Sequence, residues 1–306
     1  MTAVATLEDV TMRFRSATAV DGVTASIEAG AITGLLGRNG AGKTTLMQLL
    51  TGHRVPTSGR IRVFGEQPYE NEDVLRRICF VKEGQRYPDA FRVKDAVEAA
   101  SWLHPGWDDE LAQSLLADFE LPLRRPVKKL SRGMTSAVGI VIGLASRAPL
   151  TIFDEPYLGL DAVARQLFYD RLIADYAEHP RTVLLSTHLI EEIGDLLEHV
   201  LLIDSGRLLL AADADSLRDS AVTVTGPADR VAGFGRGRTV LRTESLGAFR
   251  RSVVSGAADQ DRLAAQALGL TAEPTSLQQL VVALSHRSTP STQPPVDGPV
   301  RLEEVS

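Results

Sequence analysis

The stretch Gly37–Thr44 has the residue types and the spacing of a phosphate-binding loop. It reads GRNGAGKT, fits the pattern G-x-x-x-x-G-K-[ST], and lies between an apolar strand and a helix-forming run, which argues against a chance glycine-rich turn. Glycines let backbone N–H groups turn towards an anion, and a helix N-terminus adds positive charge. We expect Lys43 to contact the β- and γ-phosphates of a nucleotide, and the Thr44 hydroxyl to bind Mg²⁺. The predicted nucleotide-binding residues are Gly37, Arg38, Asn39, Gly40, Ala41, Gly42, Lys43, Thr44 and Thr45.

Two acids end the apolar run of Leu150–Pro156, which reads LTIFDEP. Ligands of α/β sheets gather at the carboxyl ends of strands, so both acids are expected beside the phosphate loop. Asp154 is placed to hold Mg²⁺, directly or through water, and Glu155 to orient and polarise an attacking water. The alternative is a helix-capping pair before a proline, which the nearby phosphate loop makes the weaker interpretation.

A third candidate follows the apolar run Ile78–Val81, within ICFVKEGQRYPDAF. Glu83 and Gln85 lie just past this predicted strand, two residues apart. Either side chain could serve a ligand at the end of the sheet, and the alternative is a solvated turn.

These residues need elements to position them, and the hydrophobic pattern alternates between strands and helices. We expect an α/β core with a parallel sheet and an antiparallel flank from the first hairpins. A hairpin with Ser205-Gly206 at its turn should follow the last parallel strand. The other expected elements are strands within 4–28, at 31–36, up to Gly65, and in PLTIFDEP and RTVLLSTH, with helices at about 43–50 and 93–119.

The pattern of expected strands and helices changes after about Asp215. Residues 216–287 read roughly as β-α-β-β-α-β-α, which is compatible with a small ferredoxin-like or related α+β accessory domain. Residues 288–306 are rich in Pro, Ser and Thr, so we expect a disordered tail.

Composition excludes several classes of function. A net charge of −6 and a pI near 5.6 indicate no general affinity for nucleic acid. The single cysteine, Cys79, rules out a disulfide framework and a cysteine-ligated zinc site. The first ten residues have no signal-peptide pattern, and the apolar run Ala137–Ala145 is too short to span a bilayer. Any work at a membrane would therefore need a membrane-embedded partner.

Further motifs carry a family resemblance. LSRGM, Leu130–Met134, lies between the phosphate loop and the acidic strand and resembles the LSGGQ signature of ABC ATPases. EPYLGLD resembles the E-P-[TS]-S-x-L-D run of that family, with Asp161 as its D-loop aspartate. STH resembles the family's switch motif, with His188, and Phe14 takes the place of the aromatic that stacks on adenine. His188 could instead be an ordinary histidine, and Phe14 a core residue.

The resemblance covers about residues 4–215. It implies a P-loop NTPase domain of the ABC ATPase type at 1–215, with a helical subdomain at about 85–146. It also implies ATP and Mg²⁺ as ligands, and a head-to-tail dimer in which each signature faces the ATP of the other chain. The residues that would act across this dimer are Ser131, Gly133 and Met134.

The chain departs from the family pattern at several positions. Arg132 stands where the signature has a glycine, Met134 where it has glutamine, and Leu158 where the D-loop has serine. In the family, a glutamine before the helical subdomain reaches Mg²⁺ and the attacking water. Counting along ICFVKEGQRYPDAF places Glu83 there, with Gln85 as the alternative after a two-residue shift.

The roles that the resemblance implies are therefore divided among a few residues. The predicted catalytic residues are Glu155, His188 and Glu83, and the predicted metal ligands are Thr44, Asp154 and Glu83.

The expected function is that of an ATP-binding and ATP-hydrolysing subunit of an ABC transporter of the exporter type. It would power a separate membrane permease through ATP-driven closure of a dimer, at the cytoplasmic face of the cell membrane. The competing interpretation is an ABC-type ATPase that acts away from membranes, but this chain has one ATPase cassette, no sustained heptads and one cysteine. A third reading, compatible with the first, makes the C-terminal region a ligand sensor. The sequence does not indicate the transported substrate, or whether the partner is an identical chain.

Overall fold

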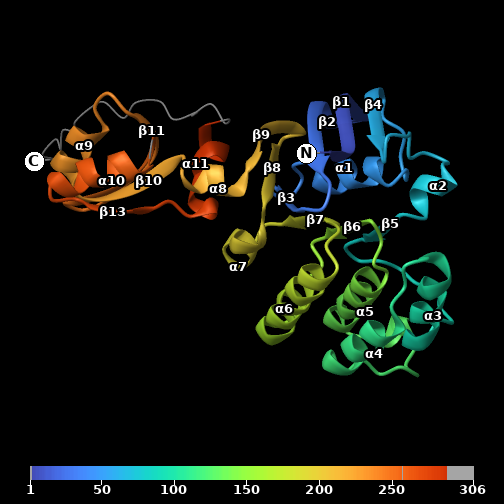
Figure 1. The fold of residues 1–306 in the computed structure, drawn as a ribbon. Coiled ribbons are helices and arrows are strands. Elements are labelled where there is room, and N and C mark those ends of the chain that lie inside the picture. The colour runs from blue at the N-terminus through green and yellow to red at the C-terminus, as the bar shows by residue number, and fades with distance from the viewer. Residues whose placement is uncertain (1, 257, 288–306) are drawn as a thin grey trace, which may run out of the picture.

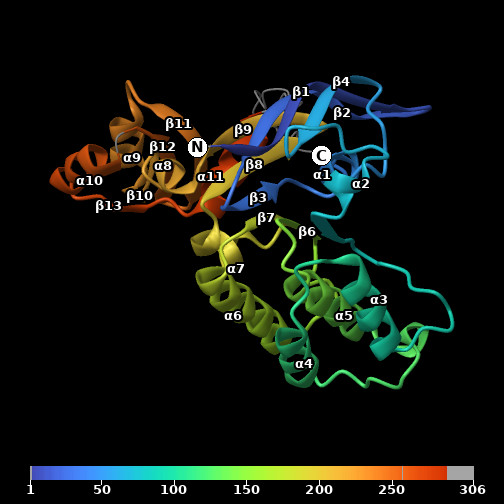
Figure 2. The same ribbon diagram turned by 45° about the vertical axis from the view of Figure 1, so that its right-hand side comes forward.

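The computed structural model describes residues 2–256 and 258–287 (Figures 1 and 2). A larger unit contains a six-stranded sheet, a three-stranded sheet and a group of helices, and a smaller C-terminal unit contains a four-stranded sheet. Within the described residues, no helix is both long enough and apolar enough to cross a membrane.

The six-stranded sheet of the larger unit has the order β5-β6-β7-β3-β8-β9. Its strands are β3 (Ile32–Leu36), β5 (Ile78–Val81), β6 (Leu150–Asp154), β7 (Thr182–Thr187), β8 (His199–Asp204) and β9 (Arg207–Asp213). All neighbouring pairs are parallel except β8 with β9, which form the expected hairpin. Its turn residues, Ser205 and Gly206, both have positive φ, as a tight two-residue hairpin turn requires. Every residue of β3, β6 and β7 is buried, which accounts for their continuous apolar runs.

The register of this sheet aligns the ends of its parallel strands. Asp154 pairs with Ser186, and Leu36 pairs with Thr187. Val81 pairs with Phe153, one residue before Asp154. The loops that follow these four strands therefore start from one end of the sheet, where the candidate site residues lie.

An antiparallel sheet of order β2-β1-β4 forms the expected flank. It consists of β1 (Ala3–Phe14), β2 (Ala17–Glu28) and β4 (Ser58–Val63), and α1 (Lys43–Leu50) lies beside it. Leu7, Val23, Leu46 and Leu50 share one buried apolar cluster with residues of the central sheet. This packing fixes α1, and with it the loop that precedes it.

Helices α3 to α6 gather on the opposite side (Figure 1). They are α3 (Val93–Leu103), α4 (Asp109–Asp118), α5 (Arg132–Ala145) and α6 (Ala162–Glu178), with the 3₁₀ turn η1 (Val127–Lys129) between α4 and α5. The short helix α2 (Glu72–Leu75) lies near α1 instead, and its Val74 belongs to the same buried cluster as Leu46. The short helix α7 (Ile190–Ile193) and the 3₁₀ turn η2 (Gly194–Leu196) follow β7. The expectation of a single helical run over 93–119 was wrong. Pro105 and Gly106 interrupt it, and Asp108 begins a new helix by accepting a hydrogen bond from the Leu111 N–H at 2.8 Å.

The C-terminal unit has the element order expected from its sequence. After α8 (Ala214–Arg218) come β10 (Ala221–Pro227), α9 (Ala228–Gly235), β11 (Thr239–Leu246), β12 (Phe249–Ser255), α10 (Ala258–Ala267), β13 (Thr271–Pro274) and α11 (Leu277–Arg287). The antiparallel order β11-β12-β10-β13 agrees with a ferredoxin-like arrangement. The domain boundary near residue 215 stays a prediction, because α8 runs through it, and the expected disordered tail lies outside the described residues.

The last helix returns to the larger unit. Leu277, Leu280 and Val281 of α11 belong to the same buried cluster as Ile190 and Ile193 of α7. The two units therefore share one apolar core at this seam.

Close packing of α5 on the central sheet gives a test of the fold. A Cβ added at Gly143 would lie 2.4 Å from the Phe153 ring and 2.8 Å from Val81. Gly143→Ala is expected to lower the free energy of unfolding by about 1–3 kcal/mol, measured by chemical denaturation. Gly233→Ala in α9 is the matched control, because a Cβ there meets nothing within 4 Å. That change should leave stability unchanged or raise it by up to about 1 kcal/mol; equal effects of the two variants would contradict the packing.

Candidate active site

The phosphate loop joins β3 to α1 with a backbone that requires glycine. Gly40 and Gly42 have φ of 82° and 108°, values that L side chains rarely adopt. A Cβ at Gly42 would also lie 2.3 Å from the Ala19 carbonyl oxygen. The Lys43 side chain is buried and folds over the loop, donating from Nζ to the Gly37 carbonyl at 2.7 Å. The Lys43 side chain is thus tied to the loop that it follows.

The end of β6 places a buried carboxylate against α1. Asp154 Oδ2 accepts a hydrogen bond from the Thr44 hydroxyl at 2.8 Å, and Oδ1 accepts one from the Ser186 hydroxyl at 2.8 Å. Burial raises the pKa of Asp154, the two hydroxyl donors partly offset this rise, and the charges of Glu155 and Glu83 add to it. Ser186 was not predicted as a site residue; its place opposite Asp154 in β7 becomes visible only from the register.

Glu155 follows directly in an unusual backbone conformation. Its φ is 48°, in the left-handed region, and its N–H donates to the Ser186 hydroxyl at 3.0 Å. This turn keeps the carboxylate at the site, where Oε1 lies 3.3 Å from Lys43 Nζ. The other oxygen, Oε2, lies 2.8 Å from His188 Nδ1. The structure thus brings together three predicted site residues from α1, β6 and the end of β7.

Tyr157 is a contact of this cluster that sequence reasoning missed. Its hydroxyl donates to Glu155 Oε2 and lies 3.1 Å from His188 Nδ1. The only signal in the sequence was EPY, where the family run has threonine or serine after EP.

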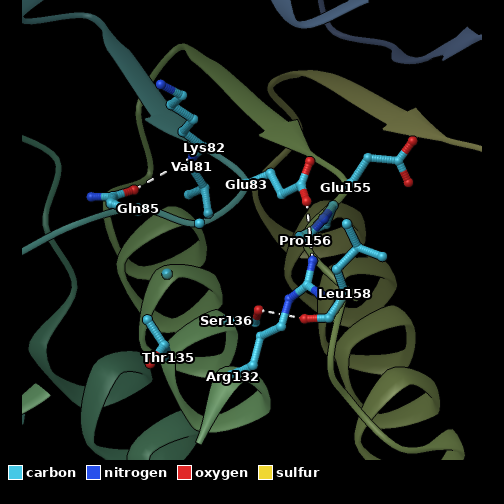
Figure 3. A pocket seen from close by; sticks show the side chains of 12 residues that line it. Val81, Lys82, Glu83, Gln85, Arg132, Thr135, Ser136, Glu155, Pro156 and Leu158 are labelled. Carbon is cyan, nitrogen blue, oxygen red and sulfur yellow. Dashed lines mark hydrogen bonds and ion pairs between the residues drawn. The ribbon is translucent and has the colours of Figure 1, made fainter. Parts of the chain in front are cut away.

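Glu83 and Gln85 point in different directions from the turn after β5 (Figure 3). Glu83 Oε1 forms an ion pair with Arg132 Nη2 at 3.1 Å. Gln85 turns back on its own loop, where its Oε1 accepts a long hydrogen bond from the Lys82 N–H at 3.4 Å. Both Glu83 and Gln85 line one pocket with Glu155, Arg132 and Leu158, and the charge of Glu83 acts on Asp154. Lining the pocket does not distinguish the two residues, so the role of Glu83 beside the metal stays a prediction.

The ion pair joins two departures from the family pattern. The carboxylate at 83 and the arginine at 132 each replace an uncharged family residue, and each is the partner of the other. Both side chains are partly exposed, so the pair contributes little to stability. It places a cation beside Glu83 at the edge of the site.

The predicted signature forms the start of α5. Ser131 caps the helix, its hydroxyl accepting from the Met134 N–H at 3.1 Å. A Cβ at Gly133 would lie 2.3 Å from the Gly159 carbonyl oxygen, so only glycine fits. Ser136 donates to the Leu158 carbonyl at 2.7 Å, which holds α5 against the loop after β6.

The predicted D-loop aspartate has a local partner. Asp161 caps α6 by accepting from the Ala164 N–H at 2.9 Å. Its side chain is therefore engaged as a helix cap, and a role across a dimer remains a prediction.

Phe14 ends β1 with its ring partly exposed. The guanidinium of Arg54 lies over this ring, 4.9 Å from its centroid. Phe14 is thus not a core residue, and stacking of adenine on it remains a prediction.

The predicted metal ligands offer hard oxygen donors, as Mg²⁺ prefers. They fit the ion only in part, because no cluster of three or more His, Cys, Asp or Glu side chains suited to a metal forms among the described residues. The nucleotide phosphates and water would have to complete the coordination shell, as is usual for Mg²⁺. The raised pKa of Asp154 is consistent with a carboxylate that a cation would stabilise in its ionised form.

This arrangement has the parts needed for phosphoryl transfer to water. A loop of backbone N–H groups with a lysine can hold phosphates, Asp154 and Thr44 can hold a cation, and Glu155 can polarise a water.

Comparisons with known proteins agree with this geometry. The profile of the family described as ABC transporter matches residues 20–158. The bacitracin transport ATP-binding protein BcrA of Bacillus licheniformis is 33% identical over 216 residues, which cover 69% of this chain and 70% of that protein. The Nod factor export ATP-binding protein I of Cupriavidus metallidurans is 30% identical, with 72% of this chain and 75% of that protein covered.

A solved structure extends the likeness to three dimensions. The ATP-binding subunit of an ABC transporter is 25% identical to this chain and superposes with a TM-score of 0.63, covering 70% of this chain and 92% of that one. The chain therefore belongs to the ATP-binding subunits of ABC transporters, which are ATPases.

Proposed function

We propose that this chain hydrolyses Mg²⁺-ATP with Glu155 as the general base, in a dimer that drives an export permease. The observation that carries this proposal is the convergence of Lys43, Asp154, Glu155 and His188 at one end of the central sheet. They come from three segments far apart in the sequence, and a purely structural role would not require that combination.

The proposed cycle starts with a change of partner for Lys43. Lys43 Nζ contacts both the Gly37 carbonyl, at 2.7 Å, and Glu155 Oε1, at 3.3 Å. Phosphate groups in the loop would attract Lys43 and free Glu155 Oε1 to orient a water. Mg²⁺ would supply charge neutralisation at the β- and γ-phosphates, held by Asp154, Thr44 and Glu83.

The dimer is proposed because the start of the signature helix is exposed and could meet a second subunit. Ser131 and Arg132, at the start of α5, are exposed, and the helix N-terminus there is suited to a phosphate. We propose that Ser131, Gly133 and Met134 contact the γ-phosphate bound to a second subunit, with Asp161 at the same interface.

The relatives support a transport role. BcrA is named for bacitracin transport, and the Cupriavidus metallidurans protein for Nod factor export. We propose that this chain likewise works with a membrane-embedded permease, at the cytoplasmic face of the membrane. An ABC-type ATPase that acts away from membranes is the competing function.

Glu155→Gln is expected to lower ATP turnover by about 10²–10⁴-fold while ATP binding persists, because the amide cannot accept the proton of water. With ATP it should accumulate a dimer, seen by light scattering. Lys43→Ala is the contrasting variant, since it should lose nucleotide affinity itself. Wild-type turnover in Glu155→Gln would remove Glu155 from the proposed role.

Glu83→Gln tests the carboxylate near the metal. Glu83 would repel the γ-phosphate when Mg²⁺ is absent, so the ATP affinity of the wild type should depend on Mg²⁺ by roughly 5-fold more than that of Glu83→Gln. Equilibrium binding of ATP with and without Mg²⁺ measures this ratio.

Two further variants serve as controls for the same measurement. Arg132→Ala removes the cation 3.1 Å from Glu83 and should increase the Mg²⁺ dependence. Gln85→Ala should leave it unchanged. If Gln85→Ala rather than Glu83→Gln alters the ratio, the metal role belongs to Gln85.

The transport role can be tested by partner capture. Affinity purification of this chain from detergent-solubilised membranes should recover a protein with several membrane-spanning helices, and its yield should change with ATP in the Glu155→Gln variant. Recovery of the chain only from the soluble fraction, with unchanged export after its deletion, would favour the competing function.

A further inference from the structure

The hydroxyl of Tyr157 sits at the centre of the catalytic cluster. The side chain is almost fully buried, with 2% of its surface exposed. Its ring packs edge-on against the His188 ring at 5.7 Å. The hydroxyl oxygen lies within hydrogen-bond distance of four groups: Glu155 Oε2, Thr187 Oγ1, His188 N and His188 Nδ1.

The hydrogen-bonding capacity of a phenol limits how these contacts are shared. A tyrosine hydroxyl has one proton to donate and two lone pairs to accept with. The His188 backbone N–H can only donate, and does so at 3.0 Å. Thr187 Oγ1 accepts from the Leu189 N–H at 2.8 Å and donates to Tyr157 at 2.9 Å. Both lone pairs are then used, and the single proton of Tyr157 goes to Glu155 Oε2.

This arrangement treats the two oxygens of Glu155 differently. Oε2 is held by Tyr157 and lies 2.8 Å from His188 Nδ1. Oε1 is buried and receives no hydrogen bond from the described residues; its cationic neighbour is Lys43 Nζ at 3.3 Å. Lys43 is the side chain expected to turn towards phosphate, so Oε1 is the oxygen left to meet a water.

Tyr157 is also suited to remain a donor. Burial, and then its hydrogen bond to Glu155, raise the pKa of Tyr157 well above its usual range, so the phenol stays protonated. A neutral donor can support the ionised carboxylate before it accepts a proton, without adding charge to the site.

We propose that Tyr157 is a positioning residue, which fixes Glu155 Oε2 and the backbone at His188 so that Oε1 of Glu155 faces the attacking water. The inference rests on the proposed role of Glu155 as general base. It adds a residue that lies outside the family pattern, since that pattern has threonine or serine at this position, whose hydroxyl is on a much shorter side chain.

Tyr157→Phe in the whole chain removes one oxygen and keeps the ring. We expect kcat for ATP hydrolysis to fall about 10-fold or more, from the loss of a hydrogen bond to a charged group, while KM for ATP stays within about 2-fold. The control is Tyr176→Phe, which also loses a hydrogen-bonded hydroxyl, to the Gly30 carbonyl at 2.6 Å and Glu198 at 2.7 Å, but far from this cluster. It should leave both constants unchanged.

A double-mutant cycle separates positioning from stability. If Tyr157 acts through Glu155, adding Tyr157→Phe to Glu155→Gln should not reduce the residual single-turnover rate further. Additive losses would overturn the proposal, as would a Tyr157→Phe variant that lowers the thermal midpoint like Tyr176→Phe and keeps wild-type kcat.

A spectroscopic measurement keeps the test independent of how well Tyr157→Phe folds. The chain has five tyrosines, so tyrosine labelled with ¹³C at Cζ gives a spectrum simple enough to assign with single Phe substitutions. In Glu155→Gln, the Tyr157 signal should shift and that of Tyr176 should stay. An unchanged Tyr157 signal would overturn the inference.

The two proposals fail in distinguishable ways. Wild-type turnover in Glu155→Gln would remove the general base, and with it the inference. An inactive Glu155→Gln together with a fully active Tyr157→Phe would remove only the role of Tyr157.

Discussion

Two adjacent carboxylates are buried at the end of β6, and the rest of the site is organised around them. Asp154 is 1% exposed and Glu155 is 6% exposed. Buried charges are costly unless they are paired or hydrogen-bonded. Thr44 of α1 and Ser186 of β7 donate hydrogen bonds to Asp154. Lys43 of α1 forms an ion pair with Glu155. The chain thus supplies partners for both carboxylates from α1 and β7.

The need to pair these charges also suggests how a bound nucleotide would affect residues outside the phosphate loop. Lys43 can balance either Glu155 or a phosphate group, but a single ammonium cannot satisfy both fully. Glu83 likewise has a cationic partner, Arg132, at 3.1 Å. Arg132 is the first residue of α5, and Ser136 of the same helix donates a hydrogen bond to the Leu158 carbonyl in the loop after β6. Contacts therefore connect the turn after β5 and the loop after β6 to the start of α5.

Sequence reasoning reached the site through motifs and missed what depends on three-dimensional proximity. The loop at 37–44, the acids at 154 and 155 and the hairpin turn at 205–206 each carry a local signal. The structure places the loop between β3 and α1, the acids at the end of β6 and the turn between β8 and β9, as expected. Tyr157 and Ser186 carry almost none, because their partners are about thirty residues away and meet them only through the register of β6 and β7. The helix expected over 93–119 is divided into α3 and α4 for a local reason. The apolar spacing continues across this segment, but Pro105 and Gly106 interrupt the helical backbone. The ion pair between Glu83 and Arg132 becomes visible only from side-chain geometry, because the two residues lie far apart in the sequence.

The left-handed backbone at Glu155 has a consequence for how this site can evolve. A φ of 48° is energetically unfavourable for glutamate, and glycine or asparagine adopts this backbone conformation at lower cost. The position is thus one where the fold would gain stability from a change that destroys the chemistry. Variation selected for stability alone would be expected to replace this residue, so a glutamate at this position implies selection for another property. A chain of this kind that had lost its ATPase activity, and served only as a scaffold, would be expected to show glycine or asparagine there.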